Sequence, residues 1–159
     1  MATTLAYIAS LCTRKYTSSA NAKNDVACQE FYDSSYNYVG IISFPGLNLE
    51  NKVITEIWLD IDAEKAGYGV KNTKTVYLRK ANYQDDIASG VTGGQYVGDE
   101  LGTFEGAFYG NYNGYHITGP LFDAMAAYIS AGNNSFTIYN PLALSLIHIS
   151  EPTRPISIS

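Results

Sequence analysis

Two stretches of this chain alternate between apolar and polar residues, and this alternation constrains the fold more than any other feature. In VITEIWLDID, residues 53–62, one face carries Ile57, Leu59 and Ile61, and the other carries Glu56, Trp58, Asp60 and Asp62. In TKTVYLRK, residues 73–80, the inner positions are Val76 and Leu78. Side chains of a β-strand point alternately to opposite faces, so both stretches are predicted to be strands with one buried face.

Further strands are expected where β-branched and aromatic residues are concentrated between turn signals. These stretches are residues 3–12, 36–44, 102–118 and 135–140. Pro45–Gly46 is a turn signal directly after the second of them. Many short strands with frequent turns predict an all-β fold, an antiparallel β-sandwich.

One short helix is expected at about residues 120–131. Pro120 suits the first helical position, where its missing N–H costs nothing. Gly132 suits the left-handed conformation that ends many helices. The apolar residues Leu121, Phe122, Met125, Tyr128 and Ile129 recur between these signals at helical spacing.

Charge and hydropathy exclude several classes of partner. The 159 residues carry a formal net charge of -5, which argues against nucleic acid and anionic membranes as partners. No apolar run approaches the roughly 20 residues that span a bilayer. Cations follow the first apolar segment instead of preceding it, so we expect no signal peptide and a true start at Met1. The two cysteines, Cys12 and Cys28, are too few for a disulfide framework.

Two segments resemble DNRLRE-type domains. They are YVGIISFPGLNLENKVITEIWLDID, residues 38–62, and YHITGPLFDAMAAYISAGNNSFTIYN, residues 115–140. The second has a strand, a short helix, a Gly-Asn turn and a strand, as the closing part of that family does. The resemblance implies a jelly-roll sandwich similar to carbohydrate-binding modules. Such domains occur on secreted glycan-active enzymes, surface proteins and phage tail or baseplate components.

Catalysis has little support in the sequence. His116 stands alone on an expected strand, where a hydrogen-bonded structural role is the more common one. The acidic residues Asp60, Asp62, Glu64, Asp99 and Glu100 are expected to be solvated on outer strand faces and not to form a catalytic pair. Ca²⁺ is the one cofactor that the DIDAE segment, residues 60–64, could suit. The Gly-rich residues 89–98 lack the features of a phosphate loop and are expected to form a long flexible loop.

Aromatic residues are the best candidates for ligand binding. The chain has 14 tyrosines, and a mixture of Tyr, Ser, Gly and Asn suits recognition because Tyr offers a large contact area at low entropy cost. Sugars present flat C–H faces that pack on such rings. The candidate ligand-binding residues are Tyr36, Tyr38, Trp58, Tyr109, Tyr112 and Tyr115. The alternative is that half or more of the tyrosines are core residues or cross-strand pairs.

The last sixteen residues differ in character from those before them. LSLIHISEPTR, residues 144–154, resembles the translation of a transposon-based sequencing adapter, and a short barcode and further adapter bases account for residues 155–159. We therefore expect residues 1–143 to form a single, C-terminally truncated sandwich domain and residues 144–159 to be a non-native tail. The tail could pair as a strand at the open sheet edge or hang free, and we expect it to have little order.

These observations favour a non-catalytic module of a phage virion, in the tail or baseplate, that binds a host surface glycan and is made in the host cytoplasm. One alternative is a carbohydrate-binding module of a bacterial secreted or surface protein. Another is a structural virion domain that contacts other virion proteins and binds no ligand. An enzyme is the least favoured class. The sequence leaves both a monomer and an oligomer open.

Overall fold

The computed structural model describes ten segments of the chain, and most of them are strands. These segments are residues 3–7, 11–16, 22–23, 27–28, 38–61, 73–84, 91–107, 113–138, 149–150 and 156–158. Every strand pair among them is antiparallel. The prediction of an antiparallel, mostly β fold is therefore confirmed.

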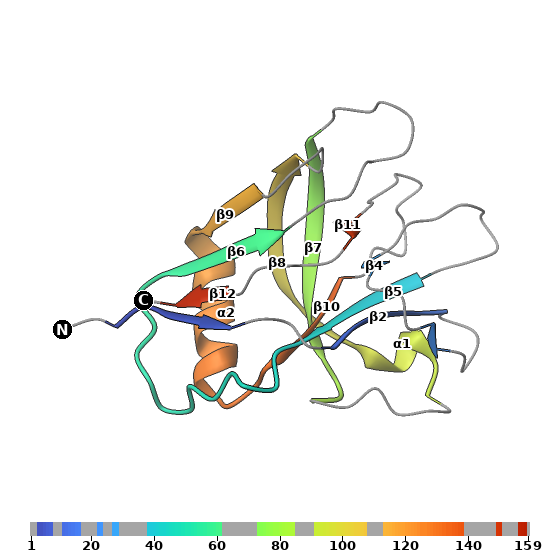
Figure 1. Cartoon of the computed structure of the whole chain (residues 1–159), viewed down its shortest axis with the longest axis horizontal. Helices are drawn as coiled ribbons and strands as arrows, with labels where there is room; N and C mark the ends of the chain where they lie inside the picture. Colours follow the sequence, from blue (N-terminus) through green and yellow to red (C-terminus); the bar gives the residue numbers. More distant parts are fainter. Residues whose placement is uncertain are drawn as a thin grey trace.

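The larger sheet has six strands in the order β3-β2-β5-β10-β7-β8. Their bounds are β2 (Leu11–Tyr16), β3 (Ala22–Lys23), β5 (Tyr38–Ser43), β7 (Thr73–Ala81), β8 (Val97–Ala107) and β10 (Ser135–Ile138). All four residues of β10 are buried, because this strand pairs with β5 on one side and β7 on the other. Figure 1 shows β7 and β8 side by side across the middle of the molecule.

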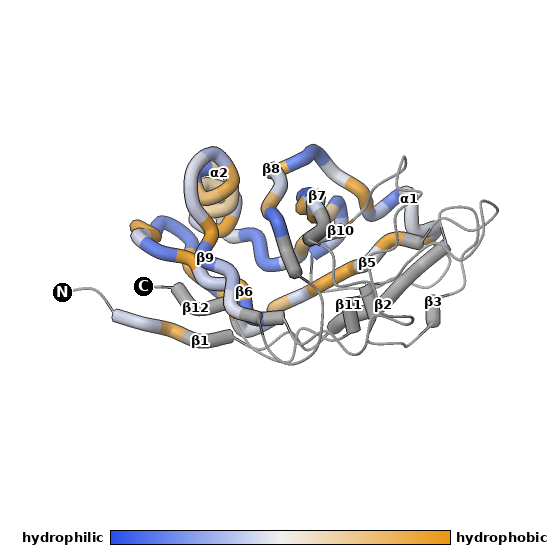
Figure 2. Tube along the Cα trace, turned by 90° about the horizontal axis from the view of Figure 1, so that it is seen from above, coloured by the Kyte–Doolittle hydropathy of each residue, from blue (hydrophilic) through white to orange (hydrophobic). Residues whose placement is uncertain are grey.

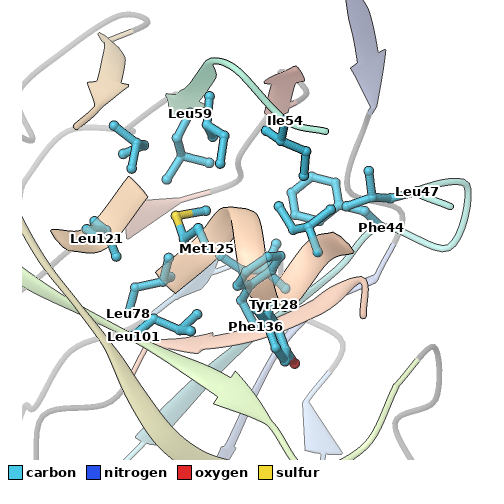
Figure 3. Packing of buried hydrophobic residues seen from close by; sticks show 14 of the residues in the cluster. Phe44, Leu47, Ile54, Leu59, Leu78, Leu101, Leu121, Met125, Tyr128 and Phe136 are labelled. Carbon is cyan, nitrogen blue, oxygen red and sulfur yellow. The ribbon is translucent and has the colours of Figure 1, made fainter. Parts of the chain in front are cut away.

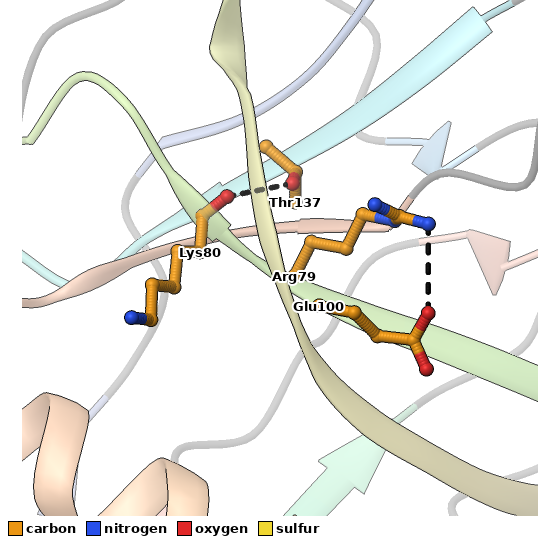
Figure 4. Close-up of polar contacts among 4 residues, drawn as sticks. All are labelled: Arg79, Lys80, Glu100 and Thr137. Atoms are coloured by element: carbon orange, nitrogen blue, oxygen red, sulfur yellow. Dashed lines mark hydrogen bonds and ion pairs between the residues drawn. The ribbon is translucent and has the colours of Figure 1, made fainter.

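Side-chain contacts also join the strands of the larger sheet. The Thr137 hydroxyl of β10 donates a hydrogen bond to the Lys80 carbonyl of β7 at 3.0 Å. Arg79 and Glu100 form an ion pair of 3.5 Å between β7 and β8. In Figure 4, Arg79 and Lys80 leave β7 in opposite directions, as neighbours on a strand do.

The smaller sheet has four strands in the order β1-β12-β6-β9. Their bounds are β1 (Leu5–Tyr7), β6 (Ile57–Ile61), β9 (Asn113–Ile117) and β12 (Ile156–Ile158). A separate two-stranded pair joins β4 (Ala27–Cys28) to β11 (Ile149–Ser150). The adapter-like segment therefore contributes two short strands, and β12 pairs on both of its sides, with β1 and with β6. These five residues of the tail are therefore paired in sheets and do not hang free.

The expected helix is present as α2 (Gly119–Ser130), with Thr118 as its N-cap. Gly119 has φ +63° and Gly132 has φ +97°, so glycines occupy the left-handed positions at both ends. The helix has 12 residues, whereas crossing a bilayer takes roughly 20. Among the residues that the structure describes, no helix is long and apolar enough to span a membrane.

One hydrophobic core contains side chains from both sheets and from α2. β6 contributes Ile57 and Leu59, and β7 contributes Val76 and Leu78, so the alternation predicted for these strands is confirmed. Figure 3 shows Met125 of α2 among these side chains, between Leu59 and Leu78. In Figure 2, α2 lies above β6 and β9, to one side of β7 and β10. The two sheets are thus held together by one apolar interior.

The structure corrects two expectations: that the Gly-rich residues 89–98, of which it describes 91–98, form a long flexible loop, and that the chain has a single helix. A one-turn helix, α1 (Gly93–Tyr96), begins after Thr92 and leads directly into β8. The Thr92 backbone N–H donates to Gln95 Oε1 at 2.8 Å, which is half of a capping box. Tyr96 is fully buried against Val39 and Ile41 of β5. Burial of Tyr96 against β5 holds the segment in place, although Gly93 and Gly94 precede it.

Candidate functional site

The outer face of β6 and β9 carries the exposed tryptophan of the smaller sheet. The strand register places Trp58 directly opposite His116. Because Ile57 and Leu59 are buried, Trp58 between them points away from the core, and it is 37% exposed. The indole and imidazole rings are stacked, with centroids 4.5 Å apart and an interplanar angle of 6°. One face of the indole is therefore covered by a second flat ring.

Glu56 fixes the orientation of this pair. It lies two residues before Trp58, and the indole Nε1 donates a hydrogen bond to Glu56 Oε1 at 2.6 Å. The same oxygen lies 3.4 Å from His116 Nε2, a contact that becomes an ion pair when the imidazole is protonated. All three side chains remain partly exposed. The indole thus has a stacking partner and a hydrogen-bond acceptor, and both limit its rotation.

Gly114 leaves space beside the tryptophan. It pairs with Asp60, the next outward residue of β6 after Trp58. A Cβ atom at Gly114 would lie 2.9 Å from Asp60 Oδ1 and 3.9 Å from Trp58 Cε3. Because both atoms are near that one point, they lie within about 7 Å of each other, the usual separation of strand residues i and i+2. We call Glu56, Trp58, Asp60, Gly114 and His116 together the Trp58 platform.

The structure describes two of the predicted binding side chains, Trp58 and Tyr115, and places them on opposite faces of the smaller sheet. Tyr115 lies on β9 between Gly114 and His116, so it points to the opposite face from Trp58. Its ring packs at 5.2 Å from Phe104, against the core. Tyr38 is the first residue of β5, and at this position the structure describes the backbone alone. Tyr36, Tyr109 and Tyr112 lie outside the described residues. Trp58 is therefore the one predicted residue that the structure shows on an outer surface.

Four members of the Trp58 platform, Glu56, Asp60, Gly114 and His116, are not among the predicted binding residues. The sequence predicts a structural role for His116 and none for Glu56, because the pattern of one segment does not say which other segment pairs with it. The signal that could have found them is their outward position in the alternating pattern. That signal identifies a cluster only when β6 is known to pair with β9.

The described residues give no support for a bound metal. Of the acidic residues in the DIDAE segment, Asp60 is described, whereas Asp62 and Glu64 lie outside the described part of the chain. Within that part, no three His, Cys, Asp or Glu side chains gather at one point. The platform therefore offers an oriented aromatic ring with two carboxylates near it, those of Glu56 and Asp60.

Comparison with known proteins gives no relative from which a role could be transferred. No protein-family model matches this chain, and no curated protein matches it.

Proposed function

We propose that this chain is a non-catalytic module that binds a host surface glycan through the Trp58 platform. The observation that carries the proposal is the exposed indole of Trp58, held by a ring on one face and by a carboxylate at its N–H. A tryptophan buries a large area on binding. A ring that is already oriented loses little conformational freedom when a ligand packs on it, and this preorganisation favours affinity.

The polar groups of the platform suit a saccharide. A sugar has flat C–H faces, which pack on an aromatic ring, and hydroxyl groups around its edge, which donate hydrogen bonds. Glu56 lies just before β6 and holds the indole N–H, and Asp60 of β6 places a second carboxylate acceptor beside the ring, within reach of a sugar hydroxyl. Small-molecule sites combine apolar surface with a few placed polar groups in this way.

The wider biological setting is a phage virion, in the tail or baseplate, with the strands connected as in a jelly roll. Support for this setting comes from the sequence resemblance described above, which is an analogy of fold and of occurrence. The alternative, a carbohydrate-binding module of a bacterial secreted or surface protein, uses the same platform. The genes next to this coding sequence distinguish the two, because tail-assembly genes would favour the virion and secretion or glycan-degradation genes the alternative.

A structural role without a ligand is the second candidate function. The stacked Trp58–His116 pair and the contacts to Glu56 also join β6 to β9, and cross-strand pairs of this kind stabilise sheets by roughly 0.2–1 kcal/mol each. On this alternative, Trp58 contributes to stability and nothing binds to its free face.

Binding of the full chain to an array of bacterial surface glycans tests the proposal. Replacing Trp58 with Ala should weaken binding at least about tenfold, since roughly 1.4 kcal/mol of lost contact has that effect. Tyr83→Ala is the matched control, because Tyr83 is 36% exposed, nearly as much as Trp58, and lies away from the platform in contact with Tyr96. Equal losses in both variants, or no binding by the unmodified chain, would favour the structural role.

A further inference from the structure

We infer that the Trp58 platform selects sugars that carry a free, positively charged amino group over neutral and anionic sugars. This inference rests on the proposed function and names the ligand class of the same surface. It follows from the charge of the platform and from the position of one carboxylate, that of Asp60.

The Asp60 carboxylate has no partner within the described part of the chain. No hydrogen bond or ion pair there involves it, although its side chain is only partly exposed. Glu56, just before the same strand, already accepts the indole N–H. Asp60 is therefore the carboxylate of the platform that is available to a ligand.

Gly114 opens the approach to this carboxylate. Any larger residue at position 114 would place its Cβ 2.9 Å from Asp60 Oδ1, inside the space that a ligand atom would need. The same point is 3.9 Å from the edge of the indole. A sugar packed on the indole of Trp58 can thus place a substituent beside Asp60 while it stays in contact with the indole. The indole and the Asp60 carboxylate are separated by about one strand repeat.

An ammonium group is the substituent that gains most at this position. A charge-assisted hydrogen bond to a carboxylate is about twice as strong as a neutral one. A sugar hydroxyl lacks this charge, and a sugar carboxylate or sulfate would be repelled by Asp60 and Glu56.

The charge of the whole chain acts in the same direction. Two carboxylates stand on the platform against one imidazole, which is charged only when protonated, and the chain has a net charge of -5. A negative field raises the local concentration of cationic ligands and lowers that of anionic ones. Added salt should therefore weaken binding of the amino sugar more than binding of a neutral one.

Calorimetric titration of the full chain with two oligosaccharides of equal length tests the inference. One is a β-1,4-linked glucosamine oligomer with free amines, and the other is the same oligomer fully N-acetylated. We expect the amine form to bind about tenfold more tightly at low salt, and Asp60→Asn to remove this preference. Asp99→Asn is the matched control, because Asp99 is an exposed carboxylate of β8 and not part of the platform. Gly114→Ala should reduce binding of the amine form by displacing the Asp60 carboxylate.

Each outcome separates the inference from the proposed function. If both oligomers bind equally, or if Asp60→Asn keeps the preference, the inference is wrong and glycan binding stands. If the Asp99→Asn variant loses the preference as well, overall charge and not the platform is responsible, which also overturns the inference. If neither these oligomers nor any array glycan binds, both the proposed function and the inference are wrong.

Discussion

Replacing Tyr128 with Phe tests how the helix is joined to the larger sheet. Tyr128 of α2 is 7% exposed, and its hydroxyl donates to the Ser135 carbonyl at 2.7 Å. The same oxygen accepts the Ala81 N–H at 3.1 Å and the Gln84 side-chain amide at 2.9 Å. One oxygen atom thus links α2 to the end of β7 and to the start of β10.

The expected cost follows from these three contacts. The ring of Phe keeps the edge-to-face contact with Phe136, whose centroid is 5.4 Å away, so the loss is confined to the hydroxyl. A hydrogen bond contributes roughly 0.5–1.5 kcal/mol, and a buried group that loses its partner costs roughly 1–3 kcal/mol. Since Ala81 is itself buried, we expect the free energy of unfolding to fall by about 2–3 kcal/mol.

Urea unfolding followed by circular dichroism measures this difference. Tyr77→Phe is the matched control, because Tyr77 lies half-buried on β7 and its hydroxyl makes no hydrogen bond within the described part of the chain. The control should stay within about 0.5 kcal/mol of the unmodified protein. A Tyr128→Phe variant as stable as the control would refute the role given to the hydroxyl.

The pH dependence of stability gives a second test of the same group. Burial raises the pKa of Tyr128 above its ordinary value near 10, and the hydrogen bonds from Gln84 and the Ala81 backbone offset part of this rise. The unfolded chain therefore loses this proton at lower pH than the folded protein does. The contribution of the neutral hydroxyl is complete below about pH 10 and is lost as the pH rises toward the folded pKa. The difference between the unmodified protein and Tyr128→Phe should shrink over that range, and a constant difference would contradict the assignment.

Two further pairs of substitutions, each with its own control, follow from backbone geometry and packing. Gly102→Ala should destabilise the fold by about 1–3 kcal/mol, because Gly102 has φ +150° and a Cβ there would lie 3.2 Å from the Leu121 side chain. Gly119→Ala is the control: Gly119 has φ +63° but open space around it, so the variant should lose less stability in the same urea titration. Met125→Ala should lower the free energy of unfolding by about 2–5 kcal/mol through the cavity it leaves, because Met125 is fully buried. Val53→Ala is the control, because Val53 is 89% exposed and its replacement should change thermal stability little.

Elements whose determinants are local in sequence were predicted well. The alternation in β6 and β7 identified their buried residues, since a strand needs no other information to divide its faces. The limits of α2 followed from Pro120 and Gly132, because both residues act through their own backbone conformation.

Features that depend on pairing between distant segments were not predictable in the same way. Trp58 and His116 are far apart in sequence and meet only because β9 pairs with β6. For the same reason, Tyr115 was expected at a binding surface, whereas the structure places it beside Phe104. Burial of Tyr96 on β5 likewise decides the conformation of a stretch whose glycines predicted a flexible loop.

Trp58 is the single tryptophan of the whole sequence, and it stands at the centre of the proposed binding surface. The intrinsic indole fluorescence of the protein therefore comes from one known position. Its emission wavelength and its quenching by small solutes report directly on the surroundings of that ring, with no label attached and no background from a second tryptophan. The molecule thus carries its own optical probe of whether the outer face of β6 and β9 is bare or covered.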